Sequence, residues 1–539
     1  MSTELGKVAT LLDRDTDRST PLQRRLAAFG KRLSLAVIAI CGVLFTVGVL
    51  RGEPPMLMAL TAISLAVAAI PEALPAVVTV LLALGARKMV TFNALIRRLP
   101  SVETLGSVSF ICSDKTGTLT QNRMHAEVLL ADGESWQPGE PSPKPVHQEL
   151  LRAAALCNDA THTLKGGWAG DPTETALTQV AGDAGLHKPT LEQDAQRVLE
   201  FPFDAERKRM TTFHRTPDGL VAYTKGAPEA VLAQCTSQWQ PGGESPLRRA
   251  EVLGAAEKLA TQGLRVLALA RRSYEQLPGT GELEVVESGL CLIGLIGLID
   301  PPRPEAAVAV RDCISAGITP VMITGDHPAT ARAIAQRLGI LSGAESDVLT
   351  GADLAALNDA ALRERVRTVR VYARVDPLQK IRIVEALQAH GEFVAMTGDG
   401  VNDAPALKQA DIGVAMGRGG TDVAREASSL VLLDDNFATI VAAVREGRRI
   451  YDNIRKFVRY AMTGNSGEIW TIFLAPLMGL PIPLLPIHIL WINLVTDGLP
   501  GLALAAEPAE RGVMQRPPRP PSESLFSHGM WQHILAIGL

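Results

Sequence analysis

The distribution of apolar residues limits the fold of this chain more than any other feature. Two long apolar stretches, residues 33–86 and 461–506, enclose residues 87–460, which have an ordinary globular composition. Residues 33–50 contain no charged side chain and come near the length of a helix that crosses a bilayer. The sequence therefore predicts a membrane protein with a large soluble insertion.

A short turn divides each apolar stretch into a predicted helical hairpin. The predicted spans are residues 33–50 and 56–84 in the first hairpin, 461–480 and 484–506 in the second, and the start of a further span at 531–539. Lysine and arginine flank both hairpins on the side of the insertion, so the positive-inside rule places the insertion in the cytoplasm. Core helices of a soluble protein are the alternative, but they would not explain basic flanks at every crossing.

Length, charge and cysteine content exclude several other classes of protein. A chain of 539 residues is too long for one core, so several domains are expected. A net charge of −4 argues against a nucleic-acid-binding protein. The six cysteines form no C-x-x-C pair, which indicates neither a zinc site nor a disulfide framework, and the polar N-terminus is not a signal peptide.

Three apolar, strand-like runs of the insertion each end in a polar turn. The first run leads into Asp-Lys-Thr-Gly-Thr-Leu-Thr at residues 114–120. The second ends in Thr-Gly-Asp at residues 324–326, and the third in Thr-Gly-Asp-Gly-Val-Asn-Asp at residues 397–403. Because ligands bind at the carboxyl ends of the strands in open α/β sheets, we expect the three turns to converge on one phosphate and one metal ion.

These residue types fit phosphoryl transfer to a carboxylate. Asp114 is a competent nucleophile, and Lys380 can neutralise part of the negative charge of the transferred group. Asp399 is a good magnesium ligand, supported by Asp403. Two threonines can donate hydrogen bonds to phosphate oxygens: Thr116 and Thr324. No G-x-x-x-x-G-K-[ST] motif occurs, so the nucleotide is not held by a Walker loop.

The motif pair Asp-Lys-Thr-Gly-Thr-Leu-Thr and Thr-Gly-Asp-Gly-Val-Asn-Asp-Ala-Pro resembles type II P-type cation-transporting ATPases, especially sarcoplasmic reticulum-like calcium pumps and their bacterial relatives. The resemblance runs from about residue 20 to the end. It implies a multidomain membrane protein with an α-helical transmembrane bundle, a haloacid-dehalogenase-like α/β phosphorylation domain and an inserted α+β nucleotide-binding domain. Asp300-Pro301-Pro302-Arg303 resembles the hinge by which the chain returns from the insertion.

The same resemblance implies domain boundaries. They are the end of an actuator domain and its linker at 1–32, a transmembrane hairpin with a broken Pro-Glu helix at 33–86, the phosphorylation domain at 87–122 and 298–440, the nucleotide-binding domain at 123–297, a stalk at 441–460, a second hairpin at 461–506, a cytoplasmic loop at 507–530 and the next span from 531 to 539.

The resemblance also assigns residues to ATP and Mg²⁺. The catalytic set is Asp114, Lys115, Thr116, Thr324, Gly325, Asp326, Lys380, Asn402 and Asp403, with Asp114, Thr116 and Asp399 at the magnesium ion. The nucleotide set is Glu174, Phe203, Lys225 and Arg265. An aromatic face beside a cation suits a purine and its phosphates.

Polar residues inside the apolar stretches predict an ion path. Pro71 leaves the Val67 carbonyl without a helical partner, and Glu72 stands in this break at membrane depth, where an ionisable group indicates function. The second hairpin adds Asn465 and Glu468 on one helix face, and Asn493, Thr496 and Asp497 on another.

The resemblance groups these residues into two cation sites. The first comprises Val67, Ala68, Ile70, Glu72, Asn493 and Asp497, and the second comprises Asn465, Glu468, Thr496 and Asp497. Oxygen ligands suit hard cations, whereas heavy-metal pumps carry a Cys-Pro motif in place of Pro71-Glu72, because soft ions prefer thiolates. Ca²⁺ is therefore the first choice of transported ion and Mn²⁺ the second.

We identify no residue in this sequence that would remove the phosphate from Asp114. The family's Thr-Gly-Glu-Ser loop is not found, because Thr280-Gly281-Glu282 is followed by Leu283. We expect a bacterial plasma-membrane protein that takes phosphate from ATP but does not complete a cycle alone, with actuator and C-terminal portions from another chain as candidate partners. A membrane-anchored phosphatase of the same superfamily and a non-catalytic fragment are the alternatives; the phosphatase usually has an aspartate where Thr116 stands.

Overall fold

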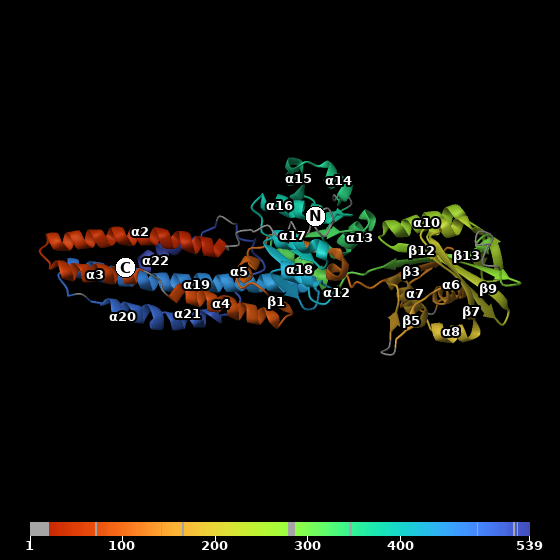
Figure 1. Cartoon of the computed structure of the whole chain (residues 1–539), viewed down its shortest axis with the longest axis horizontal. Coiled ribbons are helices and arrows are strands. Elements are labelled where there is room, and N and C mark those ends of the chain that lie inside the picture. The colour runs from red at the N-terminus through yellow and green to blue at the C-terminus, as the bar shows by residue number, and fades with distance from the viewer. Residues whose placement is uncertain are drawn as a thin grey trace. The chain divides into compact units, whose positions relative to one another are not determined.

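The computed structural model of the chain describes residues 21–69, 73–141, 143–163, 167–278, 286–343, 348–481, 483–520, 523–524 and 526–539 (Figure 1). It divides into two compact units. The first contains residues up to Asp114, Glu305–Ile323 and Leu349–Leu539, and the second contains Lys115–Pro304 and Thr324–Val348. The second unit encloses the predicted nucleotide-binding segment, residues 123–297.

The α/β part of the first unit is built on an eight-stranded sheet, counted over the described residues, with the order β1-β19-β18-β17-β2-β14-β16-β15. Strand β2 pairs in parallel with β14 on one side and β17 on the other, and the parallel pairing continues through β18 to β19. The chain thus crosses to both sides of β2, as in doubly wound α/β folds, which confirms the predicted α/β sheet. The strands are β1 (Ala94–Ile96), β2 (Phe110–Asp114), β14 (Thr319–Thr324), β15 (Val348–Thr350), β16 (Val371–Ala373), β17 (Val394–Gly398), β18 (Ile412–Met416) and β19 (Leu430–Leu432).

Seven helices, in the described residues, accompany this sheet. They are α5 (Ser101–Leu105), α12 (Pro304–Ser315), α14 (Gly351–Ala356), α15 (Asp359–Val366), α16 (Pro377–Gln388), α17 (Ala404–Gln409) and α18 (Asp422–Ala427), with a short 3-10 turn η2 at Val401–Asp403. The core of this part joins apolar side chains of the central strands, such as Ile323 and Met396, to those of the helices, such as Val384 and Leu407. Burial of these residues on both sheet and helices fixes the strand ends that carry the polar turns.

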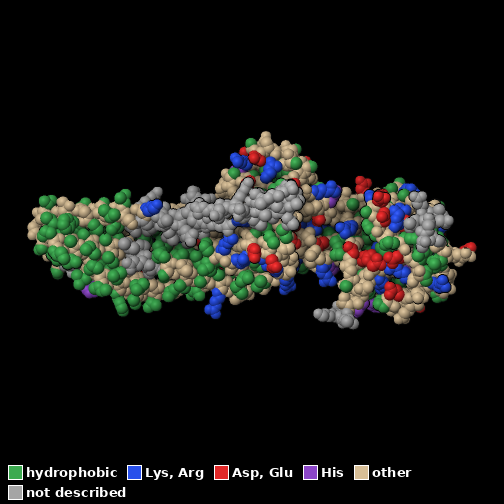
Figure 2. Space-filling model, viewed as in Figure 1, with side chains coloured by type: hydrophobic (Ala, Val, Ile, Leu, Met, Phe, Trp, Pro, Cys, Tyr) green, Lys and Arg blue, Asp and Glu red, His purple; other side chains and the backbone are tan. Residues whose placement is uncertain are grey.

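The apolar helices also belong to the first unit. They are α2 (Pro21–Leu50), α3 (Pro55–Ala68), α4 (Ala73–Val90), α19 (Phe437–Leu477), α20 (Pro486–Trp491), the π-helix η3 (Ile492–Thr496), α21 (Gly498–Ala505) and α22 (Met530–Gly538). In the view of Figure 2, hydrophobic side chains cover α3, α20 and α21, and charged side chains are scarce there. Large apolar side chains such as Ile487, Leu494 and Leu499 are exposed.

Helix length and composition do not confirm the predicted transmembrane bundle. Within the described ranges, one helical segment, Pro486–Leu504, is both long and apolar enough to cross a membrane. Ser34–Leu50 and Pro55–Ala68 are shorter apolar helices. The predicted third span does not form a helix of its own, because it continues the charged segment that was predicted to be a stalk, in the single 41-residue helix α19.

The second unit is built on a nine-stranded, mainly antiparallel sheet, counted over the described residues. Its order is β11-β10-β13-β12-β9-β8-β7, with β3 paired to β13 and β4 paired to β3. These strands are β3 (His125–Ala131), β4 (Glu134–Trp136), β7 (Gln196–Asp204), β8 (Arg209–Thr216), β9 (Gly219–Gly226), β10 (Cys235–Gln240), β11 (Gly243–Pro246), β12 (Arg265–Tyr274) and β13 (Leu290–Ile299); β5 (Thr161–His162) and β6 (Trp168–Ala169) form a separate hairpin.

Apolar side chains cover both faces of this sheet. Along β12, Leu269 belongs to one buried cluster, whereas its neighbours Ala268 and Ala270 belong to another, as the alternation of a strand requires. The first cluster includes α6 (Pro145–Leu156), α7 (Pro172–Asp183) and α8 (Lys188–Asp194), and the second includes α9 (Pro228–Ala233) and α10 (Arg249–Thr261). Helix α13 (Pro328–Leu338) completes the described helices of this unit.

Candidate functional site

Asp114 is the last residue of β2, at the carboxyl end of the central strand of the parallel sheet. Its backbone N–H donates to the hydroxyl oxygen of Thr397 on β17 over 2.8 Å. The four residues before it are buried, while its own side chain is 20 % exposed. The carboxylate therefore stands on rigid backbone and remains open to a ligand.

Lys380 joins two carboxylates of the first unit. Its Nζ donates to Oδ2 of Asp114 over 2.9 Å and to Oδ1 of Asp403 over 2.8 Å. Helix α16 fixes its position, because Asp376 and Gln379 form a capping box in the helical turn that leads directly to the lysine. Burial by itself would lower the pKa of the Lys380 ammonium, but the charges of Asp114 and Asp403 outweigh burial and raise the pKa. Lys380 therefore stays charged beside Asp114.

The third polar turn is held by Asp403. Its Oδ2 accepts backbone N–H groups from Gly400 over 3.1 Å and from Asp399 over 3.3 Å. Gly398 is required here, because a Cβ at this position would lie 2.5 Å from the Cβ of Asp403. Asn402 is exposed on the same turn.

The carboxylates of the first unit suit a magnesium ion. Desolvation raises the pKa of the Asp399 carboxyl, and the negative charges of Asp114 and Asp403 raise it further. Such mutual repulsion is relieved by a hard cation, so the donors present fit Mg²⁺. In the described parts of the chain, no three His, Cys, Asp or Glu side chains gather as a complete metal cage. Mg²⁺ needs no such cage, because it commonly takes one or two carboxylates together with phosphate oxygens and water.

The remaining predicted catalytic residues lie in the second unit. Nζ of Lys115 lies 2.5 Å from Oδ2 of Asp326 and 3.8 Å from Oδ2 of Asp300. The hydroxyl of Thr324 is buried and accepts the backbone N–H of Asp326 over 3.1 Å, and Gly325 between them is exposed. Thr116 is exposed in the irregular helical turn Lys115–Leu119, where Gly117 adopts a φ of 76°.

The predicted hinge binds this irregular turn directly. Arg303 donates from Nη2 to the carbonyl of Gly117 over 2.9 Å and from Nε to the carbonyl of Thr120 over 3.2 Å. The hydroxyl of Thr120 donates to the carboxylate of Asp300. Hydrogen bonds thus connect the return segment at residues 300–303 to residues 117–120.

Three of the four predicted nucleotide residues meet at the first turn of α7. Nζ of Lys225 on β9 lies 2.5 Å from Oε1 of Glu174, and both side chains are largely buried. The other oxygen of Glu174 accepts the backbone N–H of Asp159 over 3.0 Å. Arg265, at the start of β12, donates to the hydroxyl of Thr173 over 3.1 Å.

Phe203, the fourth predicted nucleotide residue, lies near the end of β7 and is 64 % exposed. The strand register places Phe203 at the same end of the strands as Lys225, and this end is called the sheet edge below. Arg209 on β8 is the partner of Asp204 on one side and of Gly226 on the other. An exposed aromatic ring and a buried lysine therefore lie two strands apart at one edge, which suits a purine nucleotide.

The predicted cation ligands of the second hairpin are mostly buried and unpaired. Nδ2 of Asn465, both carboxylate oxygens of Glu468 and both side-chain polar atoms of Asn493 have no hydrogen-bond partner in the described structure. Asp497 is also buried and accepts the hydroxyl of Tyr460 over 3.3 Å.

One predicted cation ligand is not where the sequence predicted it, and others lie outside the residues that the structure describes. Thr496 is exposed, so it does not share the buried face of Asn493 and Asp497; the π-helical turn η3 widens the helix there, with Asp497 N–H donating to the Ile492 carbonyl. Val67 and Ala68 form the end of α3. Ile70, Pro71 and Glu72 lie outside the described residues.

Some structural partners of the site were not predicted. Asp376 and Gln379 orient Lys380, and a capping-box spacing before the helix was a visible signal. Thr397 and Asp159 contact Asp114 and Glu174, but their roles depend on strand register and loop position, which no short motif encodes.

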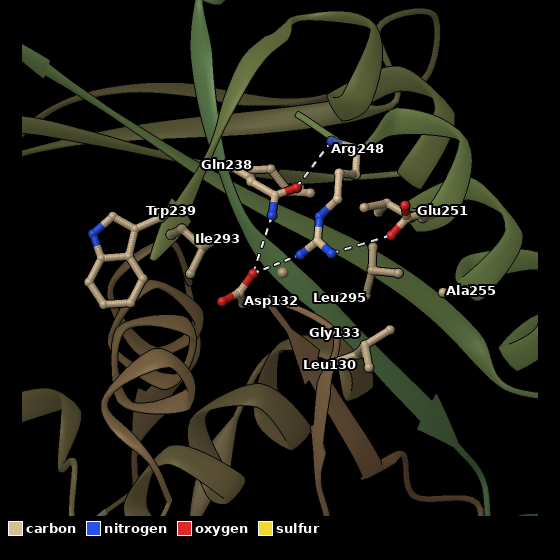
Figure 3. Close-up of a pocket in the computed structure, with 13 residues that line it drawn as sticks. Leu130, Asp132, Gly133, Gln238, Trp239, Arg248, Glu251, Ala255, Ile293 and Leu295 are labelled. Carbon is tan, nitrogen blue, oxygen red and sulfur yellow. Dashed lines mark hydrogen bonds and ion pairs between the residues drawn. The ribbon is translucent and has the colours of Figure 1, made fainter. Parts of the chain in front are cut away.

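A separate hollow in the second unit has a volume of about 70 Å³ and is lined by β10, α10, β13 and the β3–β4 turn (Figure 3). Asp132 accepts hydrogen bonds there from Gln238 over 3.3 Å and Arg248 over 2.8 Å. The polar side chains thus pair with one another, the volume is small for a nucleotide, and no predicted site residue is among the described residues that line it.

Comparisons with known proteins find matching family models and relatives. Residues 147–305 match the family model described as P-type ATPase, cytoplasmic domain N, and residues 481–539 match that described as cation transporting ATPase, C-terminus. The calcium-transporting ATPase 1 of Bacillus cereus is 46 % identical over 531 residues, which is 98 % of this chain and 59 % of the relative.

Two further relatives match along the whole chain. The calcium-transporting ATPase of Bacillus subtilis is 46 % identical over 564 residues, and the cation-transporting ATPase pma1 of Synechocystis is 43 % identical over 564 residues. The chain spans 59 %, 63 % and 62 % of the length of these three relatives. In the segments that match domain N and the C-terminus, and in these identities, the chain is similar to P-type ATPases, and the relatives named here include bacterial calcium-transporting ATPases.

Proposed function

We propose that this chain carries the phosphorylation, nucleotide and ion-binding parts of an ATP-driven cation pump in a bacterial plasma membrane, with residues 87–460 in the cytoplasm. Asp114 is the residue that takes the phosphoryl group. The observation that carries the proposal is the position of Asp114 at the carboxyl end of β2, within 2.9 Å of the buried cation of Lys380. The names of the relatives favour Ca²⁺ as the transported ion.

The chemistry follows from the groups around Asp114. A carboxylate oxygen of Asp114 attacks the γ-phosphorus of ATP, the bond from that phosphorus to the bridging oxygen breaks, and ADP leaves with the electron pair. Lys380 neutralises negative charge on the transferred group. Asp114 and Asp399 would hold Mg²⁺, with Thr116 as the third residue assigned to it, and the ion would supply further charge neutralisation. Asp403 holds Lys380 and the backbone of residues 399 and 400 in place.

ATP is held, in this proposal, by the sheet edge of the second unit. The ring of Phe203 stacks on adenine, and Lys225 and Arg265 attract the polyphosphate and ribose end. Glu174 keeps Lys225 oriented through their 2.5 Å contact. We assign Lys115, Thr324 and Asp326 to the binding of the phosphoryl group. Asp326 contacts both of the other two side chains and so holds them in place.

The unpaired buried groups support the transport of a hard cation. Oxygen atoms of Glu468 and Asn493 have no partner within the described structure, and such atoms are the ligands that Ca²⁺ prefers. The proposed sites are completed by Asn465, Asp497 and the first-hairpin residues Val67, Ala68, Ile70 and Glu72; Thr496 is left out, because it is exposed. Mn²⁺ is the second choice, because it takes similar ligands.

Labelling with γ-³²P ATP tests the enzymatic part. The chain is incubated with Mg²⁺, with and without Ca²⁺, and quenched in acid. We expect an acid-stable, hydroxylamine-sensitive label that requires Ca²⁺ and is abolished in Asp114→Asn. Release of free phosphate without label would indicate a phosphatase instead, and the absence of both would refute the proposal.

A titration of the label against Ca²⁺ and Mn²⁺ tests the ion. Asn493→Ala should raise the Ca²⁺ concentration for half-maximal labelling at least tenfold, because it removes a buried oxygen ligand. Its neighbour Leu494, which is 64 % exposed, offers the matched control Leu494→Ala. Equal effects of the two substitutions would contradict the assigned site, and labelling by Mn²⁺ at lower concentrations than Ca²⁺ would reverse the order of the ions.

A further inference from the structure

Glu287 is a fully buried carboxylate of the second unit, just before β13. Its two oxygens accept hydrogen bonds from Nη1 of Arg207 over 2.6 Å each, from Nε of Arg209 over 2.8 Å and from the hydroxyl of Thr211 over 2.7 Å. Burying a carboxylate with two guanidinium groups costs much of what their attraction gains, and apolar residues could fill the space as stably. Such a network is therefore better explained by the geometry that it imposes than by stability alone.

The geometry that it imposes is that of the turn after Phe203. Arg207 also donates from Nη2 to the carbonyl of Pro202 over 2.8 Å, so one guanidinium bridges Glu287 to the residue before the phenylalanine. On the other side, Oδ1 of Asp204 accepts the backbone N–H of Arg207 over 2.9 Å. Phe203 thus lies between two residues that are both tied to Arg207, while its own ring is 64 % exposed.

The neighbour of Glu287 restrains the strand that leads to Phe203. Val286 belongs to a buried cluster with Phe201 and Phe213. The rings of Phe201 and Phe213 meet edge to face, with centroids 5.7 Å apart. The consecutive residues Val286 and Glu287 therefore hold the chain on both sides of Phe203, one by apolar packing and the other by charge.

The same network reaches the strand of Lys225. The hydroxyl of Thr211, which donates to Glu287, lies 2.9 Å from the hydroxyl of Thr224. Gly226 lies so close to the turn that an added Cβ would be 2.4 Å from the carbonyl oxygen of Lys208. These contacts therefore fix the distance between the exposed ring of Phe203 and the buried Lys225.

We propose that Glu287 is a positioning residue for the adenine end of the nucleotide. It does not touch ATP; it orients the Phe203 turn relative to Lys225 through Arg207 and Thr211. This inference rests on the proposed function of the sheet edge as a nucleotide site. It assigns a role to a carboxylate that neither the catalytic nor the nucleotide set contains.

The experiment is isothermal titration of the full chain in detergent with two probes, ATP and inorganic tripolyphosphate. Glu287→Gln should weaken ATP binding about fivefold or more, since a displaced aromatic platform loses base stacking worth roughly fivefold to a hundredfold in affinity. Tripolyphosphate has no base, so its affinity should change less than twofold. In a Phe203→Ala background, Glu287→Gln should add less than a further twofold loss for ATP.

The matched control is Glu149→Gln in the same unit. Glu149 is also a largely buried carboxylate, and it accepts from Arg271 over 2.7 Å and from Tyr223 over 3.2 Å. We expect ATP binding within twofold of the unsubstituted chain. If Glu287→Gln prevents folding, Arg207→Lys decides the matter, because lysine keeps the charge but cannot bridge Glu287 and the Pro202 carbonyl; it should give the same loss for ATP alone.

The outcomes separate this inference from the proposed function. Equal losses for ATP and tripolyphosphate, or additive losses in the double variant, would overturn the positioning role and leave a structural one. Normal ATP binding by both Glu287→Gln and Arg207→Lys would also overturn it, while the nucleotide site itself would stand. If the unsubstituted chain does not bind ATP, the proposed function and the inference fail together.

Discussion

Substituting Lys380 by methionine tests whether the cation between two carboxylates is the centre of the phosphorylation site. The side chain of Lys380 is 8 % exposed and lies 2.9 Å from Asp114 and 2.8 Å from Asp403. At these distances each ion pair is worth about 6 kcal/mol for an effective dielectric constant near 20, before the cost of desolvation. Breaking a buried pair by removing one partner typically costs about 3–5 kcal/mol, because the remaining charge is left uncompensated.

The expected result of Lys380→Met is thus a local loss of stability together with a loss of rate. We expect about 3–5 kcal/mol less protection from hydrogen exchange for the backbone amides of β2 and β17, and about 10²–10³-fold slower formation of the acid-stable label. Hydrogen exchange is the appropriate measurement, since one unfolding free energy is not defined for a multidomain chain. As a control, Lys144→Met removes a lysine whose side chain is 64 % exposed and should cost less than about 1 kcal/mol.

A double substitution separates the two effects. Lys380→Met with Asp403→Asn removes one of the uncompensated carboxylates, while asparagine keeps an oxygen for the N–H groups of Gly400 and Asp399. Protection of β2 and β17 should recover by at least about 1 kcal/mol, but labelling should stay slow because the charge beside Asp114 is still absent. Labelling of Lys380→Met at the unsubstituted rate would refute the reasoning, whatever its stability.

Two further substitutions test the turn geometry and a buried histidine. Gly398→Ala should lower the exchange protection of β17 by about 1–3 kcal/mol, because its Cβ would lie 2.5 Å from that of Asp403; Gly400→Ala, with its nearest contact at 3.5 Å, should not, and equal effects would contradict the packing argument. His214 is buried, and desolvation lowers its pKa to about 4. The unfolded chain therefore binds more protons between about pH 4 and 6.5, so the stability of the second unit is complete above pH 6.5 and falls with pH, by roughly 2 kcal/mol at pH 5. Exchange protection of β8 at pH 7 and pH 5 measures this change, and His214→Gln should remove it; a loss of the same size in His214→Gln would assign the pH dependence to other groups.

The parts of the site that could be predicted depend on residues close together in the sequence. An apolar run followed by Asp114 predicts a strand that ends in a carboxylate, and β2 does so. Lys380 could be nominated because a transferred phosphoryl group needs a cation. Its contacts with Asp114 and Asp403 join positions 266 and 23 residues apart, and only the folded sheet shows them.

The parts that could not be predicted depend on register and on partners far apart. Glu287 finds Arg207, Arg209 and Thr211 at separations of 76 to 80 residues, and no local pattern marks a glutamate as buried. The limits of the helices in the apolar stretches also differ from the predicted ones. The charged segment and the apolar residues that follow it form the single helix α19. Periodicity reports the faces of a regular helix, and the π-helical turn η3 therefore displaced Thr496 from the face expected for it.

Buried polar groups in this chain fall into two kinds, and the difference indicates what each does. Lys380 and Glu287 are surrounded by partners, so they fix the geometry of the groups beside them. Asn465, Glu468 and Asn493 together leave five buried polar atoms without a partner in the described structure. At about 1–3 kcal/mol each, those atoms would cost roughly 5–15 kcal/mol, as much as the whole stability of a typical domain. A hard cation would offset the share of this cost that belongs to the three oxygens, two of Glu468 and one of Asn493, by ligating them directly, whereas the two amide nitrogens need hydrogen-bond acceptors. If the proposed cation site is correct, replacing Glu468 by leucine should stabilise the helices against hydrogen exchange, because two unpaired buried oxygens are removed, and it should abolish Ca²⁺-dependent labelling, because a ligand is lost.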